Sequence, residues 1–139
     1  MIILGLGSNV GNRLTYLSKA IHILSKTVLA AVEVSPIYES SAVLQAGAPE
    51  DWNKPYLNMA VCGETHLSPT DLLKKLKMIE KEIGRKARGG VWAPREIDID
   101  ILAYGDKSIQ TAELTIPHAS LFKRKSQGTG QTGSDSVQQ

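Results

Sequence analysis

The chain has 139 residues, 42% of them hydrophobic, which predicts one globular domain around a single core. Sixteen basic and 14 acidic residues give a net charge of +2, too balanced to predict a nucleic-acid partner. One cysteine excludes an internal disulfide and a cysteine-based metal site. The sequence lacks a signal peptide and any apolar run of about 18 residues, so we expect a soluble cytoplasmic protein without a membrane segment.

The first half of the chain predicts a strand, a helix and a second strand. Residues 2–6 form an apolar run that ends among glycines, and the turn SNVGN follows. Asn12 is the expected N-cap of an amphipathic helix. The apolar positions of this helix recur at spacings of three and four: Leu14, Leu17, Ile21 and Leu24. A second strand is predicted over 28–38, where Pro36 indicates an edge or bulged position.

The second half repeats this order after a long loop, 39–55, which contains Gly47, Pro49 and Pro55 and shows no clear period. Residues 56–65 predict a third strand. Ser68 is the expected cap of a second helix that Gly84 ends. Its apolar positions again follow helical spacing: Leu72, Leu76, Ile79 and Ile83. A fourth strand is predicted over 97–104.

The order β-α-β-β-α-β is typical of a ferredoxin-like α+β sandwich, an antiparallel sheet with both helices packed on one face. We expect this domain to cover 1–124. The basic, glycine-rich segment 85–91 predicts a mobile loop, and the polar segment 125–139 predicts a disordered tail, since it contains one apolar residue, Val137.

The stretch GLGSNVG, after a strand and before a helix, invites comparison with a dinucleotide-binding turn. Its spacing is G-x-G-x-x-x-G rather than G-x-G-x-x-G, and the predicted order lacks the alternation of a doubly wound sheet. We therefore interpret these glycines as a tight turn between strand and helix.

The pattern Asp-Ile-Asp-Ile raises the question of paired carboxylates on one strand. Asp98 and Asp100 share a face, with Cα atoms about 6.6 Å apart, because side chains alternate along a strand. Two metal ions about 3.5 to 4 Å apart would fit between such carboxylates. A polar solvent face opposite buried isoleucines explains the same spacing, so the pattern leaves both interpretations open.

Residues near the carboxylate pair could take part in the same site. Trp92 can stack on a purine or fill a core, and Arg95 can bind phosphate or pair with an aspartate. Glu80 lies at the margin of the apolar stripe of its helix; we expect a surface position by default, and the alternative is a carboxylate facing the cleft.

Five motifs occur together in this order: LGLGSNVG at 4–11, YLN at 56–58, IEKEIGR at 79–85, WAPREIDIDIL at 92–102 and LTIPH at 114–118. The fourth of them is highly specific. With them the chain, over 1–124, resembles the 6-hydroxymethyl-7,8-dihydropterin pyrophosphokinases of folate biosynthesis.

The resemblance implies transfer of a pyrophosphoryl group from ATP to the pterin hydroxymethyl group, with release of AMP. Asp98 and Asp100 would hold two Mg²⁺ ions as metal ligands and catalytic residues, and Arg85 and Arg95 would contact phosphate oxygens and stabilise charge in the transition state. The sequence does not decide whether Asp98 or solvent takes the proton of the attacking hydroxyl.

The resemblance also implies substrate contacts. Tyr56 would stack on the pterin, and Asn58 would form hydrogen bonds with it. The positions expected at the ATP site are Glu80, Trp92, Arg95, Ile101, Thr115, His118 and Arg124. Members of the family act as monomers on these small molecules, without nucleic acid or membrane.

The C-terminal part departs from the family pattern, since Ser126 stands where a second pterin-stacking aromatic is expected. This departure keeps one alternative function, a non-catalytic nucleotide-binding remnant of the family, and makes a dimer possible. An RNA-binding ferredoxin-like module would carry paired aromatics on its central strands, and 2–6 and 57–62 contain none.

Overall fold

The computed structural model describes residues 1–42, 44, 46–86 and 93–118. The expectations for Trp92, Arg124, the rest of the loop 87–91 and the tail 125–139 with Ser126 therefore lie outside the described residues. Five strands form the main sheet: β1 (Ile2–Ser8), β2 (Ala30–Val34), β3 (Tyr38–Ser40), β4 (Tyr56–Glu64) and β5 (Asp98–Tyr104). The strand order is β2-β4-β1-β5, every pair is antiparallel, and β3 also pairs with β4.

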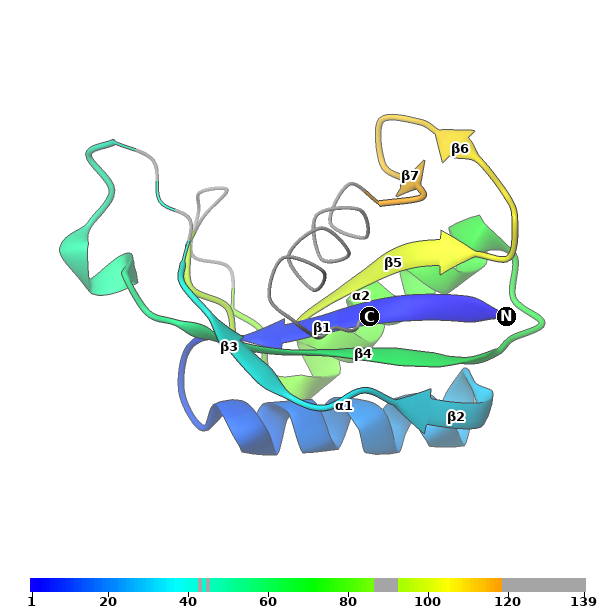
Figure 1. Cartoon of the computed structure of the whole chain (residues 1–139), viewed down its shortest axis with the longest axis horizontal. Coiled ribbons are helices and arrows are strands. Elements are labelled where there is room, and N and C mark those ends of the chain that lie inside the picture. Colours follow the sequence, from blue (N-terminus) through cyan, green and yellow to red (C-terminus); the bar gives the residue numbers. More distant parts are fainter. Residues whose placement is uncertain (43, 45, 87–92, 119–139) are drawn as a thin grey trace.

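Two helices, α1 (Arg13–Thr27) and α2 (Pro69–Ile83), pack against each other and against the sheet (Figure 1). The core lies between them and one face of the sheet. Its members alternate along β1 and recur with helical spacing on α1 and α2: Ile2, Leu4, Leu6, Leu17, Leu24, Leu72, Leu76 and Ile79. The predicted ferredoxin-like α+β sandwich is confirmed. None of the helices in the described part of the chain is long and apolar enough to span a membrane.

Both predicted helix caps are present. Asn12 Oδ1 accepts a hydrogen bond from Thr15 N at 3.1 Å, and Ser68 Oγ accepts one from Asp71 N at 3.2 Å. Gly84 ends α2 at a φ of +125°, a backbone conformation that residues with a Cβ rarely adopt. This turn directs the chain, and with it Arg85, from the helix end toward the sheet.

The predicted second strand is wrong as a single element. It is divided into β2 and β3, which both pair with β4 on the outer side of the sheet. The division occurs at Ser35 and Pro36, because Pro36 has no N–H to donate to a strand partner. Ser35 compensates locally, since its N–H donates to Ala60 O and its Oγ accepts from Ala60 N, both at 2.8 Å. The expected edge position is confirmed.

Three short elements escaped the sequence analysis. A 3-10 turn (Glu50–Trp52) lies within the predicted loop, and β6 (Ile109–Gln110) pairs with β7 (Thr115–Ile116) after β5. Elements of two or three residues are too short to show a period. β7 matters here because it lies against β5 and carries part of the expected ATP site.

The glycines of the first motif lie inside β1 rather than in a turn, so the turn interpretation is wrong for Gly5 and Gly7. Gly7 pairs with Asn58 on one side and with Asp98 on the other, and Gly5 pairs with Asp100. A Cβ on Gly7 would lie 3.4 Å from the Tyr56 ring, so the bare backbone of β1 separates two sets of side chains on the face opposite the helices. The turn glycine is Gly11, at a φ of +74°.

Candidate active site

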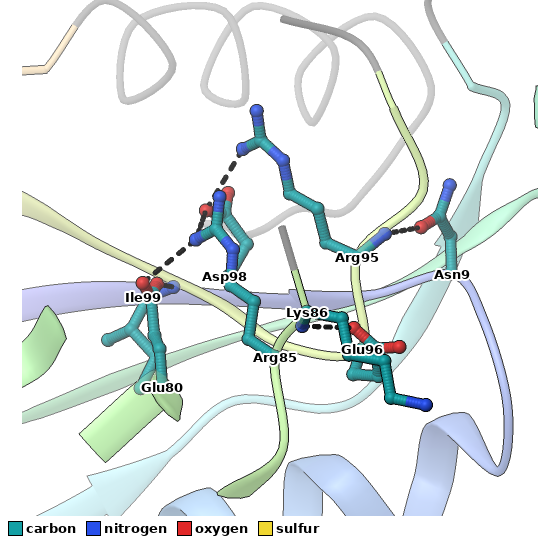
Figure 2. A network of polar contacts seen from close by, with 8 residues as sticks. All are labelled: Asn9, Glu80, Arg85, Lys86, Arg95, Glu96, Asp98 and Ile99. Atoms are coloured by element: carbon teal, nitrogen blue, oxygen red, sulfur yellow. Dashed lines mark hydrogen bonds and ion pairs between the residues drawn. The ribbon is translucent and has the colours of Figure 1, made fainter. Parts of the chain in front are cut away.

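The two aspartates of β5 lie on the face of the sheet opposite the helices, as predicted. Between and beyond them, Ile99 and Ile101 are buried in the core. Asp98 Oδ1 accepts hydrogen bonds from Arg85 Nη1 at 3.2 Å and from Arg95 Nη1 at 3.1 Å (Figure 2). Two guanidinium groups therefore share one carboxylate. The aspartate pair is part of a charged cluster rather than of an ordinary solvent-exposed face.

Asp100 has an unusual acidity. Burial raises its pKa to about 7, and the charge of Asp98, a hydrogen bond with Asp98 and the charge of Glu80 act in the same direction, while Arg95 opposes them. The largest cause is the loss of solvent on burial, and the second is the close approach of like charges. A cation between Asp98 and Asp100 would remove this repulsion.

Glu80 is buried, with 5% of its surface exposed, so the default expectation of a surface position is wrong. Its Oε2 accepts a hydrogen bond from Ile99 N at 2.7 Å, and its Oε1 accepts one from Arg85 Nη1 at 2.8 Å (Figure 2). Burial raises the pKa of Glu80, although these bonds partly offset the effect. The carboxylate therefore joins α2 to β5 and orients Arg85.

The two arginines reach Asp98 from different backbone segments. Arg85 follows the helix end at Gly84, and its N–H donates to Glu80 O at 3.0 Å. Its guanidinium then bridges Glu80 and Asp98. Arg95 approaches from the residues just before β5. Arg85 was expected on a mobile loop; in the structure its backbone and its side chain are both bonded to residues of α2 and β5.

Tyr56 and Asn58 lie across β1 from the aspartates. The Tyr56 ring lies beside Gly7, and burial raises its pKa. Asn58 is buried, and its Nδ2 donates to Ser40 Oγ at 2.8 Å. Because Gly7 pairs with both Asn58 and Asp98, one residue expected to bind the pterin and one residue expected to bind metal lie in the same row across the sheet.

The remaining residues expected at the ATP site are only partly brought together. Ile101 belongs to the core, 2% exposed, so its side chain does not share the face of the aspartates, and a contact with ATP would use its backbone. Thr115 is exposed on β7. His118 is half-buried, and its N–H donates to Leu102 O at 2.8 Å beside β5. Trp92 and Arg124 lie outside the described residues.

Two buried polar residues near the cluster escaped the sequence analysis. Asn9 bonds to the backbone of Arg95 and of Lys54, and Glu96 Oε1 accepts from Lys86 N at 3.1 Å. Figure 2 shows both beside the arginines. Asn9 belongs to the GLGSNVG motif, which we interpreted as a turn. The sequence did contain an indication of its role, because an asparagine at the end of a strand offers both a donor and an acceptor.

The charge cluster fits a divalent cation that shares its ligands with a substrate. Among the residues that the structure describes, no three His, Cys, Asp or Glu side chains are arranged to hold a metal by themselves. Two carboxylates on one face are the usual protein contribution to Mg²⁺ bound together with phosphates. Asp98 and Asp100 provide those carboxylates, and their mutual repulsion favours such an ion.

The acidity of Asp100 predicts a pH dependence of stability. Because its pKa is 3.8 in an unfolded chain and about 7 in the fold, the folded state binds the proton more tightly. This contribution is complete below pH 3.8 and is lost as the pH rises to about 7. Urea unfolding without divalent cations should therefore show Asp100→Asn gaining stability over the wild type across this range, on the order of 1 to 3 kcal/mol. Asp106→Asn, at an exposed position, is the control and should follow the wild type. If the free energies of unfolding of the wild type and Asp100→Asn changed in parallel with pH, the raised pKa of Asp100 would be refuted.

Glu80 predicts a second effect on stability. Replacing it with glutamine leaves one acceptor oxygen for two donors, Ile99 N and Arg85 Nη1. We expect Glu80→Gln to lower the free energy of unfolding by about 1 to 3 kcal/mol at pH 8, measured by urea denaturation. Glu82→Gln makes the same chemical change at an exposed position of α2 and should be neutral. Equal stabilities of the two variants would show that the buried bonds contribute little.

Comparison with known proteins identifies relatives of this chain. A sequence profile of the family described as 7,8-dihydro-6-hydroxymethylpterin-pyrophosphokinase (HPPK) matches residues 3–127. The chain is 47% identical over 123 residues to the 2-amino-4-hydroxy-6-hydroxymethyldihydropteridine pyrophosphokinase of Aquifex aeolicus, which covers 88% of this chain and 72% of that protein. The same-named protein of Bacillus subtilis is 40% identical over 122 residues, 87% of this chain and 70% of its own length.

A second group of relatives is much longer. The chain is 43% identical over 125 residues to a folate synthesis bifunctional protein of Chlamydia muridarum, which covers 88% of this chain. This chain spans only 28% of the length of the bifunctional protein. The family match nonetheless covers most of this chain and includes all the site residues from Tyr56 to Arg124. The chain belongs to the 7,8-dihydro-6-hydroxymethylpterin-pyrophosphokinase family.

Proposed function

We propose that the chain transfers a pyrophosphoryl group from ATP to 6-hydroxymethyl-7,8-dihydropterin, with release of AMP, as a step of folate biosynthesis. One observation carries the proposal: Asp98, which is paired with two arginines, lies in one row with Asn58 across the bare strand β1, and Asp100 lies on the same face two residues further along β5. The printed names of the relatives from Aquifex aeolicus and Bacillus subtilis support the same activity.

The pterin would lie over β1, on the glycine side of the row. We propose that the Tyr56 ring stacks on it and that the Asn58 amide forms hydrogen bonds with its edge. Ser40 supports this role, since its hydroxyl accepts one amide proton of Asn58 and so limits rotation of the amide. The hydroxymethyl group would then point along the row toward Asp98.

On the carboxylate side, we propose that Asp98 and Asp100 hold two Mg²⁺ ions. When bound, the ions would supply positive charge next to the triphosphate oxygens. Arg85 and Arg95, both at Asp98, would turn their guanidinium groups to phosphate oxygens and stabilise the charge that develops during transfer. We infer that Glu80 acts through Arg85 rather than on ATP, because its two oxygens are already bonded.

Further ATP contacts would come from the β7 side of β5. Thr115 and His118 lie there, and we propose that they bind ATP together with backbone atoms of Ile101 and with the side chains of Trp92 and Arg124. Arg95 belongs to this set as well. We propose a cytoplasmic enzyme. The family pattern favours a monomer, and the departure from that pattern in the C-terminal part makes a dimer possible. Light scattering would distinguish the two.

The test is ³¹P NMR of the purified chain with ATP, Mg²⁺ and 6-hydroxymethyl-7,8-dihydropterin. We expect the signals of ATP to be replaced by those of AMP and of a pterin diphosphate. Unchanged ATP would refute the proposal. If, in addition, Mg²⁺-dependent broadening of the ATP signals disappeared in Asp98→Ala, the chain would be a nucleotide-binding protein without the transfer activity.

A further inference from the structure

Asn9 is a buried polar side chain near the site to which no role has been assigned. It follows the last residue of β1 and is buried, 2% exposed. Its N–H donates to Arg95 O at 3.0 Å, and its Oδ1 accepts from Arg95 N at 2.8 Å. Its Nδ2 donates to Lys54 O at 3.1 Å. A buried amide with donor and acceptor both satisfied is held in one orientation.

The two segments that Asn9 joins belong to opposite sides of the site. Arg95 carries the guanidinium that bonds to Asp98 (Figure 2). Lys54 lies two residues before Tyr56, whose ring lies beside Gly7. Among the described residues, the second segment is also held by a bond from Arg13 Nη1 to Pro55 O at an exposed position and by the pairing of Tyr56 with Ser40. Among the described residues, Asn9 therefore extends past the end of β1 the connection that this strand makes between the phosphate side and the pterin side.

We propose that Asn9 is a positioning residue that sets the placement of Arg95 relative to Tyr56. This inference rests on the proposed function, because it concerns how the two substrate sides are aligned. In-line transfer depends on distances accurate to within about 1 Å, so a shift of either segment would slow the reaction. Asparagine suits this position because one short side chain offers an acceptor to Arg95 N and a donor to Lys54 O.

The two bonds of the side chain can be separated by substitution. Asn9→Asp keeps an acceptor for Arg95 N but places a second oxygen against Lys54 O. Asn9→Ala removes both bonds. The matched control is Asn53→Asp, which makes the same chemical change at an exposed position one residue before Lys54.

The first readout does not depend on activity. Hydrogen exchange followed by NMR should show the Arg95 amide protected in the wild type and in Asn9→Asp, and about tenfold or more faster exchange in Asn9→Ala. Pterin affinity, measured by calorimetry without ATP, should fall about tenfold in Asn9→Asp and stay within about twofold in Asn53→Asp. Unchanged exchange and affinity in the Asn9 variants would overturn the proposal.

The second readout separates positioning from general stability. If Asn9 acts through Arg95, Asn9→Ala should lower kcat about thirtyfold in the wild type and much less in an Arg95→Ala background. Equal losses in both backgrounds would mean that Asn9 only supports the fold, and would overturn the proposal. A wild-type chain without turnover would refute the proposed function instead, while exchange and pterin binding would still decide the role of Asn9.

Discussion

Asp98→Asn is expected to lower kcat by about 10³-fold or more, because the variant loses a negative charge where metal and arginines meet. Asp98 is the shared partner of Arg85 and Arg95, at 3.2 and 3.1 Å. It also lies next to Asp100 on the same face of β5, so its loss would remove half of the carboxylate pair. Initial rates of AMP release at saturating ATP and pterin measure the effect.

The control for this experiment is Asp106→Asn, an exposed aspartate in the turn after β5. It should keep wild-type kcat. The Mg²⁺ concentration that gives half-maximal rate should rise in any residual activity of Asp98→Asn and stay unchanged in the control, because Asp98 is proposed to bind metal and Asp106 is not. Near-normal turnover by Asp98→Asn would remove the carboxylate pair from the mechanism.

The second large effect is expected for Arg85→Ala, with kcat lowered by about 10³-fold and ATP affinity changed by less than about tenfold. The reason is geometric: Glu80 and the end of α2 hold the guanidinium at Asp98, where charge on the transferred group would be greatest. Arg95 remains in the variant and still provides a positive charge for ground-state binding. Single-turnover rates and calorimetric titration with a non-hydrolysable ATP analogue measure the two quantities separately.

The Arg85→Ala experiment needs two controls. Lys81→Ala removes a positive charge from the last turn of α2 at an exposed position and should leave kcat unchanged. Urea unfolding of Arg85→Ala is needed because Glu80 Oε1 loses its partner in a buried place. A loss of ATP affinity with kcat retained would show that Arg85 serves binding alone.

Much of the fold followed from patterns within short segments. Helix caps at Asn12 and Ser68 and the stop at Gly84 were predicted and are present, because a cap is a bond between residues about three positions apart. The alternation in β5 correctly placed Asp98 and Asp100 on one face. The division of β2 from β3 and the hairpin β6-β7 were missed, since such short strands are defined by their partners rather than by their own sequence.

The candidate site was predicted only in part for the same reason. Motif resemblance indicated the aspartates and arginines, yet the surface position expected for Glu80 was wrong. One acceptor of Glu80 is bonded to Ile99 N, 19 positions away, and no helical pattern contains that information. Ile101 was expected at the ATP site, and the alternation of the strand places its side chain in the core, so that its backbone is the part available for such a contact.

By itself the sequence determined the order of the two helices and the longer strands, the helix caps, the antiparallel α+β class and the face shared by Asp98 and Asp100, because these depend on neighbours within a few residues. Only the tertiary structure decided that Gly5 and Gly7 lie inside a strand between two sets of site residues, and that the pKa of Asp100 is raised to about 7. It alone paired Asn9 with Arg95, 86 positions apart. Burial and long-range hydrogen bonds arise when distant segments exclude water together, so they become defined only in the packed chain.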